Sequence, residues 1–229
     1  MKTLILSDIH GNLPALEAIF SEEQDFDQCL FLGDVVDYGP FPKECIFSLK
    51  YHMDIGVIGN HDNAIVHNVD CGCRGDFRVA SVETRIWHRS ILAPEDIDFL
   101  TGLPKTNHTL IDGLEIQLAH AAPDGNLMRY LKIEDLEKTI KDIAADLILL
   151  GHTHIQYEKR IGNSLVVNPG SVGLARDGGS ACYALLADGQ IQLKRLEYDV
   201  DRTIAAILAA PLSEQSKTFL TAVLRGQLI

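Results

Sequence analysis

The sequence lacks any apolar run long enough to cross a membrane. A spanning helix needs about 20 apolar residues, whereas the longest candidate here, ADLILLG at 145–151, has the length of a strand. The opening MKTLILSDIHG begins like a signal peptide, but its apolar stretch is too short and ends in Asp8 and His10. We therefore expect no membrane association and a cytoplasmic location.

Positive charge is also scarce. Lys and Arg number 20 against 32 Asp and Glu, which gives a formal net charge of −12. A protein that coats nucleic acid needs basic residues to displace counterions from phosphates. The composition therefore argues against binding of extended nucleic acid, but it leaves room for a local cationic pocket and leaves the oligomeric state open.

The five cysteines do not form a disulfide framework. Cys29, Cys45 and Cys182 lie among apolar neighbours, where a free thiol behaves as a small buried hydrophobe. Their odd number and the absence of a signal peptide favour a reducing compartment. Cys71 and Cys73, in DCGCRGD, lack a second Cys/His pair at zinc-site spacing. We expect a loop with incidental thiols there rather than a structural zinc site.

No internal repeat, low-complexity tract or linker interrupts the 229 residues, so we expect one domain over 1–229. The first third alternates between apolar runs and amphipathic segments. Strands are expected at 3–7, 29–34 and within 54–62, and helices at 13–22 and 42–50. This alternation favours an α/β fold with a largely parallel central sheet.

Residues 63–104 break the alternation, and we interpret them as a helical insertion over one edge of the sheet. Within 77–92, Val79, Val82, Ile86 and Trp87 recur at helical spacing, which predicts a stripe that packs into the core. A shorter helix is expected from Pro94, with a cap at Gly102.

Strands resume in the second half of the chain. Residues 109–122 predict a hairpin that turns at Asp112 and Gly113, and 181–188 with 190–199 predict a second one that turns at Asp188 and Gly189. Further strands are expected at the start of 146–154 and within 164–173. Helices are expected at 133–145, 201–209 and 213–225.

Polar side chains follow five of the expected strands. Since the carboxyl ends of strands in an open α/β sheet converge on one crevice, these side chains should meet there. Buried acids and imidazoles at apolar strand ends cost desolvation unless something compensates, and metal ions compensate well. In chain order the groups are Asp8 and His10, then Asp34 and Asp37, then Asn60, His61 and Asp62, then His120, and finally His152 and His154.

These motifs, D-x-H at 8–10, GDVVD at 33–37, GNHD at 59–62, a lone His120 and GHTH at 151–154, resemble those of the calcineurin-like metallophosphoesterases. NPGSVG at 168–173 is similar to the bacterial and archaeal phosphodiesterase branch of that superfamily. The resemblance implies a four-layer α-β-β-α sandwich with two mixed sheets flanked by helices.

The resemblance also implies a centre of two divalent metal ions. One ion would be held by Asp8, His10 and His154, and the other by Asn60, His120 and His152, with Asp34 bridging both. His61 would be a general acid or phosphate contact, and Asp37 would orient it.

The chemistry of these residues agrees with that assignment. With Asp8 and Asp34 as the only anionic ligands, two divalent ions keep a charge of about +2, which suits the charge that develops on a phosphate ester. A hydroxide that bridges the metals would attack phosphorus, and His61 could protonate the leaving group. Imidazole and amide ligands favour Mn, Fe, Zn or Ni over Ca or Mg.

The class of phosphoester depends on the residue after GDVVD. Protein phosphatases of the superfamily have an arginine there that grips phosphate, whereas this chain has Tyr38, which favours a small phosphodiester substrate. Tyr38 and Arg74 are candidate substrate contacts. The alternatives are that Tyr38 packs near Pro40 and Pro42 and that Arg74 is a solvated loop charge.

We therefore predict a di-metal phosphodiesterase. The alternatives are a phosphomonoesterase, protein phosphatases included, and a noncatalytic metal-binding scaffold of the same fold.

Overall fold

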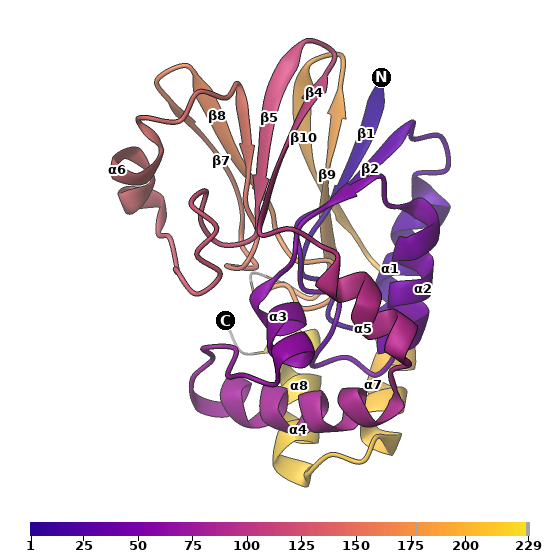
Figure 1. Cartoon of the computed structure of the whole chain (residues 1–229). Coiled ribbons are helices and arrows are strands. Elements are labelled where there is room, and N and C mark those ends of the chain that lie inside the picture. Colours follow the sequence, from indigo (N-terminus) through magenta and orange to yellow (C-terminus); the bar gives the residue numbers. More distant parts are fainter. Residues whose placement is uncertain (177, 228–229) are drawn as a thin grey trace.

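Two five-stranded sheets form the centre of the computed structural model, which describes residues 1–176 and 178–227 (Figure 1). The first sheet has the order β10–β9–β1–β2–β3, and the second has the order β4–β5–β6–β8–β7. The strands of the first sheet are β1 (Lys2–Leu6), β2 (Gln28–Phe31), β3 (Ile55–Gly56), β9 (Ala181–Ala187) and β10 (Gln190–Leu196). Those of the second are β4 (Thr106–Ile111), β5 (Leu114–Ala119), β6 (Leu147–Leu149), β7 (Gln156–Ile161) and β8 (Ser164–Pro169).

The two sheets face each other across an apolar layer, and helices cover their outer faces (Figure 1). Alternation along β1 sets this arrangement, because Ile5 points to the second sheet while Leu4 and Leu6 point outward. The outward side packs against α1 (Leu13–Glu22) and α2 (Pro42–His52). The short α6 (Leu136–Ile140) covers the outer face of the second sheet. The four-layer α-β-β-α fold implied by the resemblance is therefore confirmed, whereas the largely parallel central sheet expected from the alternation is replaced by two mixed sheets.

The parallel strands of both sheets end at the same side of the molecule. β1, β2 and β3 run parallel in the first sheet, and β5, β6 and β8 run parallel in the second. The loops that follow these strands meet below the sheets, next to α3 and α4 (Figure 1). The helices in this region are α3 (Asn60–His67), α4 (Gly75–Ile91), α5 (Pro94–Thr101), α7 (Val200–Ala209) and α8 (Glu214–Leu224).

Residues 54–62 differ from the expectation of a strand that leads into a loop, because most of this segment is not strand and its end is helical. The strand stops at Gly56, and a helix begins at Asn60. Asp62, in the first turn of that helix, accepts a hydrogen bond from the backbone N–H of Gly59 at 3.1 Å, which caps the helix. Asn60 and His61 are therefore helical residues at a helix start.

The apolar stripe predicted for α4 is confirmed only at Trp87, which packs against a hydrophobic core cluster. Ile86 is 67% exposed, and Val79, Val82 and Trp87 are only partly buried. The buried face instead carries Ala80 and the polar residues Ser81, Thr84, Arg85 and His88. The physical reason is that this face packs against the polar loop after β2, whose backbone groups need hydrogen-bond partners.

Both predicted hairpins are present. β4 pairs with β5 across Asp112 and Gly113, and β9 pairs with β10 across Asp188 and Gly189. All four turn residues have positive φ, as a two-residue type I′ turn requires.

Two details of the second half differ from the expectation. The helix expected over 133–145 shrinks to a 3₁₀ turn η1 (Ile133–Asp135) followed by α6, and β7 was not predicted. Within the described residues, no helix combines the length and the apolar character needed to span a membrane.

Candidate metal centre

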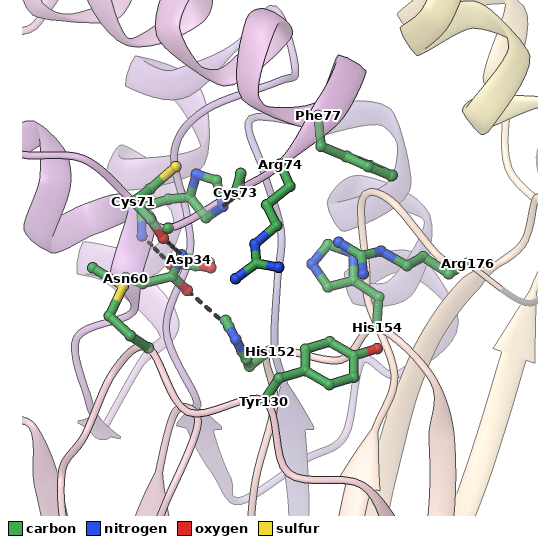
Figure 2. Close-up of a pocket in the computed structure, with 13 residues that line it drawn as sticks. Asp34, Asn60, Cys71, Cys73, Arg74, Phe77, Tyr130, His152, His154 and Arg176 are labelled. Atoms are coloured by element: carbon green, nitrogen blue, oxygen red, sulfur yellow. Dashed lines mark hydrogen bonds between the residues drawn. The ribbon is translucent and has the colours of Figure 1, made fainter.

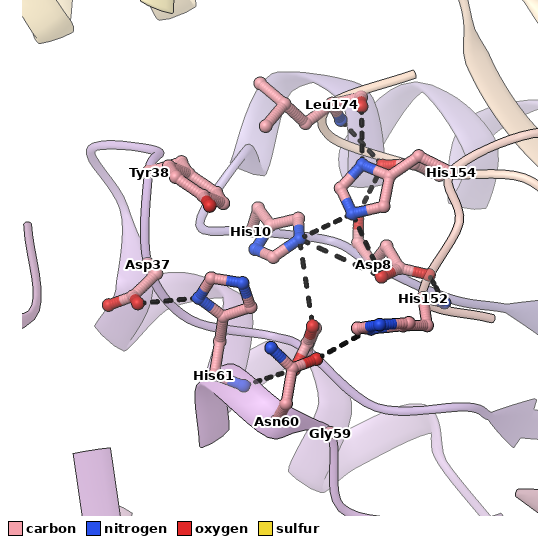
Figure 3. A network of polar contacts seen from close by, with 12 residues as sticks. Asp8, His10, Asp37, Tyr38, Gly59, Asn60, His61, His152, His154 and Leu174 are labelled. Carbon is pink, nitrogen blue, oxygen red and sulfur yellow. Dashed lines mark hydrogen bonds and ion pairs between the residues drawn. The ribbon is translucent and has the colours of Figure 1, made fainter. Parts of the chain in front are cut away.

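The loops after β1, β2, β5 and β6, together with the start of α3, bring their polar side chains to one point. Figure 3 shows those from β1, β6 and α3. Two sets could each hold a metal ion, because the ligand atoms within each set lie within 4.8 Å of one another. The first set is Asp8, His10 and His154, and the second is Asp34, His120 and His152. The convergence predicted from the strand ends is therefore present.

Backbone carbonyls fix the orientation of three of the imidazoles. The Nδ1–H groups of His10, His120 and His154 donate to the carbonyls of Val36, Leu32 and Leu174 at 2.7 to 2.8 Å. Each ring therefore turns its Nε2 toward the centre, which is the arrangement seen in metal-binding histidines. His10 Nε2 and His154 Nε2 lie only 3.2 Å apart, and two facing lone pairs at that distance need a cation between them.

The two carboxylates of the centre also need positive charge. Asp8 and Asp34 are almost fully buried, and their Oδ1 and Oδ2 atoms, respectively, have no hydrogen-bond partner. Each of these oxygens lies near an imidazole. Asp8 Oδ1 is 3.2 Å from His154 Nε2, and Asp34 Oδ2 is 3.1 Å from His120 Nε2. A divalent ion held between each oxygen and its neighbouring imidazole would supply the partner that these buried oxygens lack. These residues fit a divalent metal.

Protonation follows the same electrostatics. Burial would lower the pKa of His120, but Asp34 outweighs it and raises that pKa to about 9, so a proton replaces a cation there in the metal-free protein. Burial and neighbouring imidazoles lower the pKa of His10 and of His152 to about 3. These two rings stay neutral, which is the form that binds metal.

Asn60 completes the second set. Its Oδ1 lies 2.8 Å from His120 Nε2 and 2.9 Å from His152 Nδ1. Its amide nitrogen donates to the carbonyl of Cys71 at 2.8 Å, which fixes the oxygen toward the centre. His152 therefore offers Nδ1 where the other three imidazoles offer Nε2.

Asp62 holds two of the loops together, a role that the sequence did not assign. Its carboxylate accepts backbone N–H groups of Asp34 at 2.7 Å, Val35 at 2.9 Å and Gly59 at 3.1 Å. Gly59 is needed at this junction, because a Cβ there would lie 1.9 Å from Asp34 Oδ1. The start of α3 is thereby packed directly against Asp34.

His61 forms a hydrogen-bonded chain beside the centre (Figure 3). Its Nδ1 lies 2.7 Å from Asp37 Oδ2, and that oxygen also accepts the hydroxyl of Ser81 at 2.7 Å. Burial lowers the pKa of His61, but Tyr38, Asp34 and the hydrogen bond to Asp37 outweigh it, so the pKa lies well above its ordinary value. The predicted pairing of His61 with Asp37 is present, and Ser81 adds a contact that was not predicted.

Cys71 and Cys73 lie against this chain, so their loop packs beside the centre. Cys71 is 2% exposed, and its Sγ lies 3.1 Å from Ser81 Oγ. Cys73 Sγ lies 3.4 Å from His61 Nε2 and 3.2 Å from the Tyr38 hydroxyl. A hydrogen bond from Cys73 holds the pKa of Cys71 below its ordinary value, against the effect of burial. The remaining cysteines, Cys29, Cys45 and Cys182, are buried as predicted.

A cavity of about 470 Å³ opens over the centre (Figure 2). Arg74 lines it, and its guanidinium points inward (Figure 2). Tyr38 does not line it, because its ring is 1% exposed and packs against His10 and His61 at 4.9 and 5.0 Å between ring centroids. The predicted substrate contact of Tyr38 is therefore replaced by packing behind the histidines.

Arg176 is a second cationic group in the cavity, and the sequence did not single it out. Its guanidinium lies 4.5 Å from the Phe77 ring centre, and its buried Nε has no hydrogen-bond partner. Its backbone N–H donates to the His154 carbonyl at 3.3 Å. In the sequence, the only indication that Arg176 lies at the site was its position shortly after the NPGSVG motif.

The backbone at the centre is strained. Ten non-glycine residues of the described chain have φ in the left-handed region, and seven of them are predicted site residues. Such conformations are uncommon outside glycine and persist where the surroundings enforce them. The seven are Asp8, His10, Asp34, Asp37, Tyr38, His152 and His154.

Comparison with known proteins agrees with this geometry. Residues 1–188 match the family model described as the calcineurin-like phosphoesterase superfamily domain. The protein MJ0912 of Methanocaldococcus jannaschii is 29% identical, with 92% of this chain and 93% of that protein aligned. Phosphodiesterase YfcE of Escherichia coli K12 is 26% identical, over 91% of this chain and 98% of that protein.

Among solved structures, a metallophosphoesterase from Sphaerobacter thermophilus superposes with a TM-score of 0.83 at 29% identity, covering 97% of this chain and 98% of that one. The family model spans most of the chain, and it includes every Asp, Asn and His of the two ligand sets. On both grounds the chain belongs to the calcineurin-like phosphoesterase superfamily.

Proposed function

We propose that this protein is a metal-dependent phosphodiesterase that acts on a small substrate. The observation that carries the proposal is the cavity over the centre, whose walls combine metal-binding side chains with two arginines and apolar groups. A charged phosphoryl group and an organic substituent both find partners in such a cavity.

The ligand sets suit two divalent transition-metal ions. One ion would be held by Asp8, His10 and His154, the other by Asn60, His120 and His152, with Asp34 between them. Mixed imidazole, amide and carboxylate ligands favour Mn, Fe, Zn or Ni. When bound, the ions would supply an activated water and offset the charge that develops on the phosphoryl oxygens.

His61 is suited to protonate the leaving group. Its Nδ1 is engaged by Asp37, so Nε2 is the atom that can deliver a proton toward the cavity. The raised pKa keeps the ring protonated near neutral pH, which a general acid requires. The Ser81 hydroxyl donates to the Asp37 carboxylate, and the Asp37 backbone N–H donates to His88 Nδ1, so both ends of Asp37 are held in place.

Arg74 and Arg176 are suited to bind anionic oxygens of the substrate. No ion pair is assigned to either guanidinium within the part of the chain that the structure describes, although the protein as a whole is acidic. Their planar donors match phosphate oxygens in pairs. Phe77 and Tyr130 would contact the organic part of the substrate.

A phosphodiester uses more of this cavity than a simple monoester, since it carries a second organic group for the apolar walls. The likeness to phosphodiesterase YfcE points the same way. The two arginines, on the other hand, favour the extra charge of a phosphomonoester, which is the second candidate function.

One experiment separates these candidates. The purified protein is stripped of metal, loaded with Mn²⁺, and assayed on an aryl phosphodiester and on the matching monoester. We expect faster turnover of the diester. Faster turnover of the monoester would assign a phosphomonoesterase, and turnover of neither by protein that retains metal would leave a noncatalytic scaffold.

Variants then test the roles of individual residues. His61→Ala should keep the metal content, measured by elemental analysis, and slow hydrolysis on the order of 100-fold or more. Asp34→Ala should lose metal. His67→Ala, on the exposed end of the same helix as His61, is the matched control and should change neither. A fully active His61→Ala variant would refute the acid role.

A further inference from the structure

His61, Cys71 and Cys73 form a second group of metal-binding side chains at the edge of the centre. Their ligand atoms, one imidazole nitrogen and two sulfurs, all lie within 4.8 Å of one another. All three residues line the cavity, so an ion has a path to them from solvent. This composition differs from the oxygen and nitrogen ligands of the main centre.

The local backbone brings both sulfurs to the same side. Gly72, between the two cysteines, has φ of +83°, a conformation that a residue with a side chain rarely adopts. The carboxylate of Asp70 accepts the Gly72 N–H at 2.7 Å and fixes this turn. The backbone of Cys71 is held in turn by the amide of Asn60.

The histidine has the support that a metal ligand needs. Its Nδ1–H donates to Asp37, and a carboxylate on the far nitrogen orients the ring and raises the basicity of Nε2. Cys73 Sγ lies 3.4 Å from Nε2. A tetrahedral zinc ion with its usual bond lengths separates a sulfur and a nitrogen ligand by about 3.6 Å. The observed separation leaves room for an ion after a small adjustment.

We propose that His61, Cys71 and Cys73 form a third metal site, selective for thiophilic ions such as Zn²⁺, with its fourth position open to the cavity. Two thiolates and one imidazole are ligands that soft and borderline ions prefer, and hard ions such as Mn²⁺ avoid them. On binding, the two thiols and the protonated Nε2 of His61 release their protons to solvent. The two thiolate charges offset the charge of the ion, so the occupied site is neutral.

Occupation of this site would inhibit the enzyme. An ion on His61 Nε2 occupies the atom that would protonate the leaving group. This consequence rests on the proposed phosphodiesterase function, whereas the metal site itself does not. Thiophilic ions would then act as inhibitors while the main centre stays loaded.

Cadmium tests the site without reference to activity. The reduced, Mn²⁺-loaded protein is titrated with Cd²⁺, and the thiolate-to-metal charge-transfer absorption in the near ultraviolet is followed. We expect the band to saturate at one equivalent in the wild type and to be absent in the C71S/C73S double variant. Cys45→Ala, which removes a buried thiol of α2, is the control and should keep the band. Elemental analysis should find one more Cd²⁺ in the wild type than in the double variant.

The absence of a band in the wild type, with its thiols reduced, would overturn the proposal, as would a band that persists in the double variant. The inhibition is tested separately by adding Zn²⁺ to the Mn²⁺ enzyme. Relative to its own rate without Zn²⁺, the wild type should slow on the order of 100-fold, the scale of a lost general acid, and the double variant much less. If the absorption band appears but Zn²⁺ slows both proteins equally, the metal site stands and the inhibition is refuted. If the protein binds Cd²⁺ but hydrolyses no phosphoester, only the proposed function is refuted.

Discussion

The buried His88 should make the stability of this protein depend on pH. It lies on α4, is 0% exposed, and joins that helix to the loop after β2. Its Nδ1 accepts the backbone N–H of Asp37 at 3.2 Å, and its Nε2–H donates to the carbonyl of Gly39 at 3.0 Å. Only the neutral ring can make both bonds, since a protonated ring has no acceptor.

The size of the effect follows from the pKa. Burial lowers the pKa of His88 from 6.5 to about 4, against opposing effects of Asp37 and the Gly39 carbonyl. Because the folded-state pKa is depressed, the unfolded chain binds the proton first as the pH falls. The stabilising contribution is therefore present above pH 6.5, and about 2 kcal/mol of it is lost by pH 5 and about 3 kcal/mol by pH 4.

Urea denaturation of the metal-free protein at pH 7, 6, 5 and 4 measures this loss. His88→Gln keeps a donor and an acceptor but does not titrate in this range. The free energy of unfolding should fall between pH 7 and pH 4 by about 3 kcal/mol more in the wild type than in the variant. His67→Gln, at an exposed site, should follow the wild type. Parallel curves for the wild type and His88→Gln would refute the reasoning.

Three further predictions concern the centre. Asp37→Asn removes the carboxylate that helps to raise the pKa of His61, so the alkaline fall of kcat should move to lower pH; an unmoved limb would contradict the pairing. Gly59→Ala places a Cβ 1.9 Å from Asp34 Oδ1 and should reduce metal content by elemental analysis together with the melting temperature, whereas unchanged values would show that the junction can relax. His152→Ala and His154→Ala should each leave one of two metal ions bound, and loss of both from either variant would contradict separate ligand sets.

The positions of the metal-binding side chains could be predicted because they depend on topology. Asp8, Asp34, His120 and His152 each follow a parallel strand by a few residues, and parallel strands must end at the same side of their sheet. Order along the chain was therefore enough to bring Asp8 to Asp34 and His120 to His152, whereas the facing of the two sheets that joins these pairs was implied only by the family resemblance. The choice of ring nitrogen was not predictable, since it depends on carbonyls such as that of Leu32, far away in the sequence.

The polar face of α4 shows where sequence patterns fail. A helical stripe of apolar residues predicts a buried face only when the helix packs on an apolar surface. This helix packs on a polar loop. Ser81 donates to one carboxylate oxygen of Asp37, and His88 and Thr84 accept the backbone N–H groups of Asp37 and Tyr38. The apolar residue Ile86 is left 67% exposed.

The third metal site was missed for a related reason. Zinc sites are recognised in a sequence by Cys and His residues at short, characteristic spacings. Cys71 and Cys73 supply only two such ligands, with no further pair at that spacing. The third, His61, belongs to the motif of the main centre and lies near the sulfurs only because the chain after α3 returns to the start of that helix. A search by spacing assigns each residue to one site and cannot find a residue that two sites share.

The strained loops of the centre persist because they are hydrogen-bonded to one another. Beyond the end of β1, the N–H of Asp8 donates to the Gly33 carbonyl at 2.9 Å, and the N–H of His10 donates to the Asp34 carbonyl at 3.0 Å. On the other side, the N–H of Gly173 donates to the Asp8 carbonyl at 3.0 Å. Backbone hydrogen bonds between the loops thus continue beyond the ends of the strands. They stabilise left-handed backbone conformations that an isolated loop would not keep. The loops that carry the metal ligands are therefore ordered before any metal binds, so metal binding does not carry the entropic cost of ordering them.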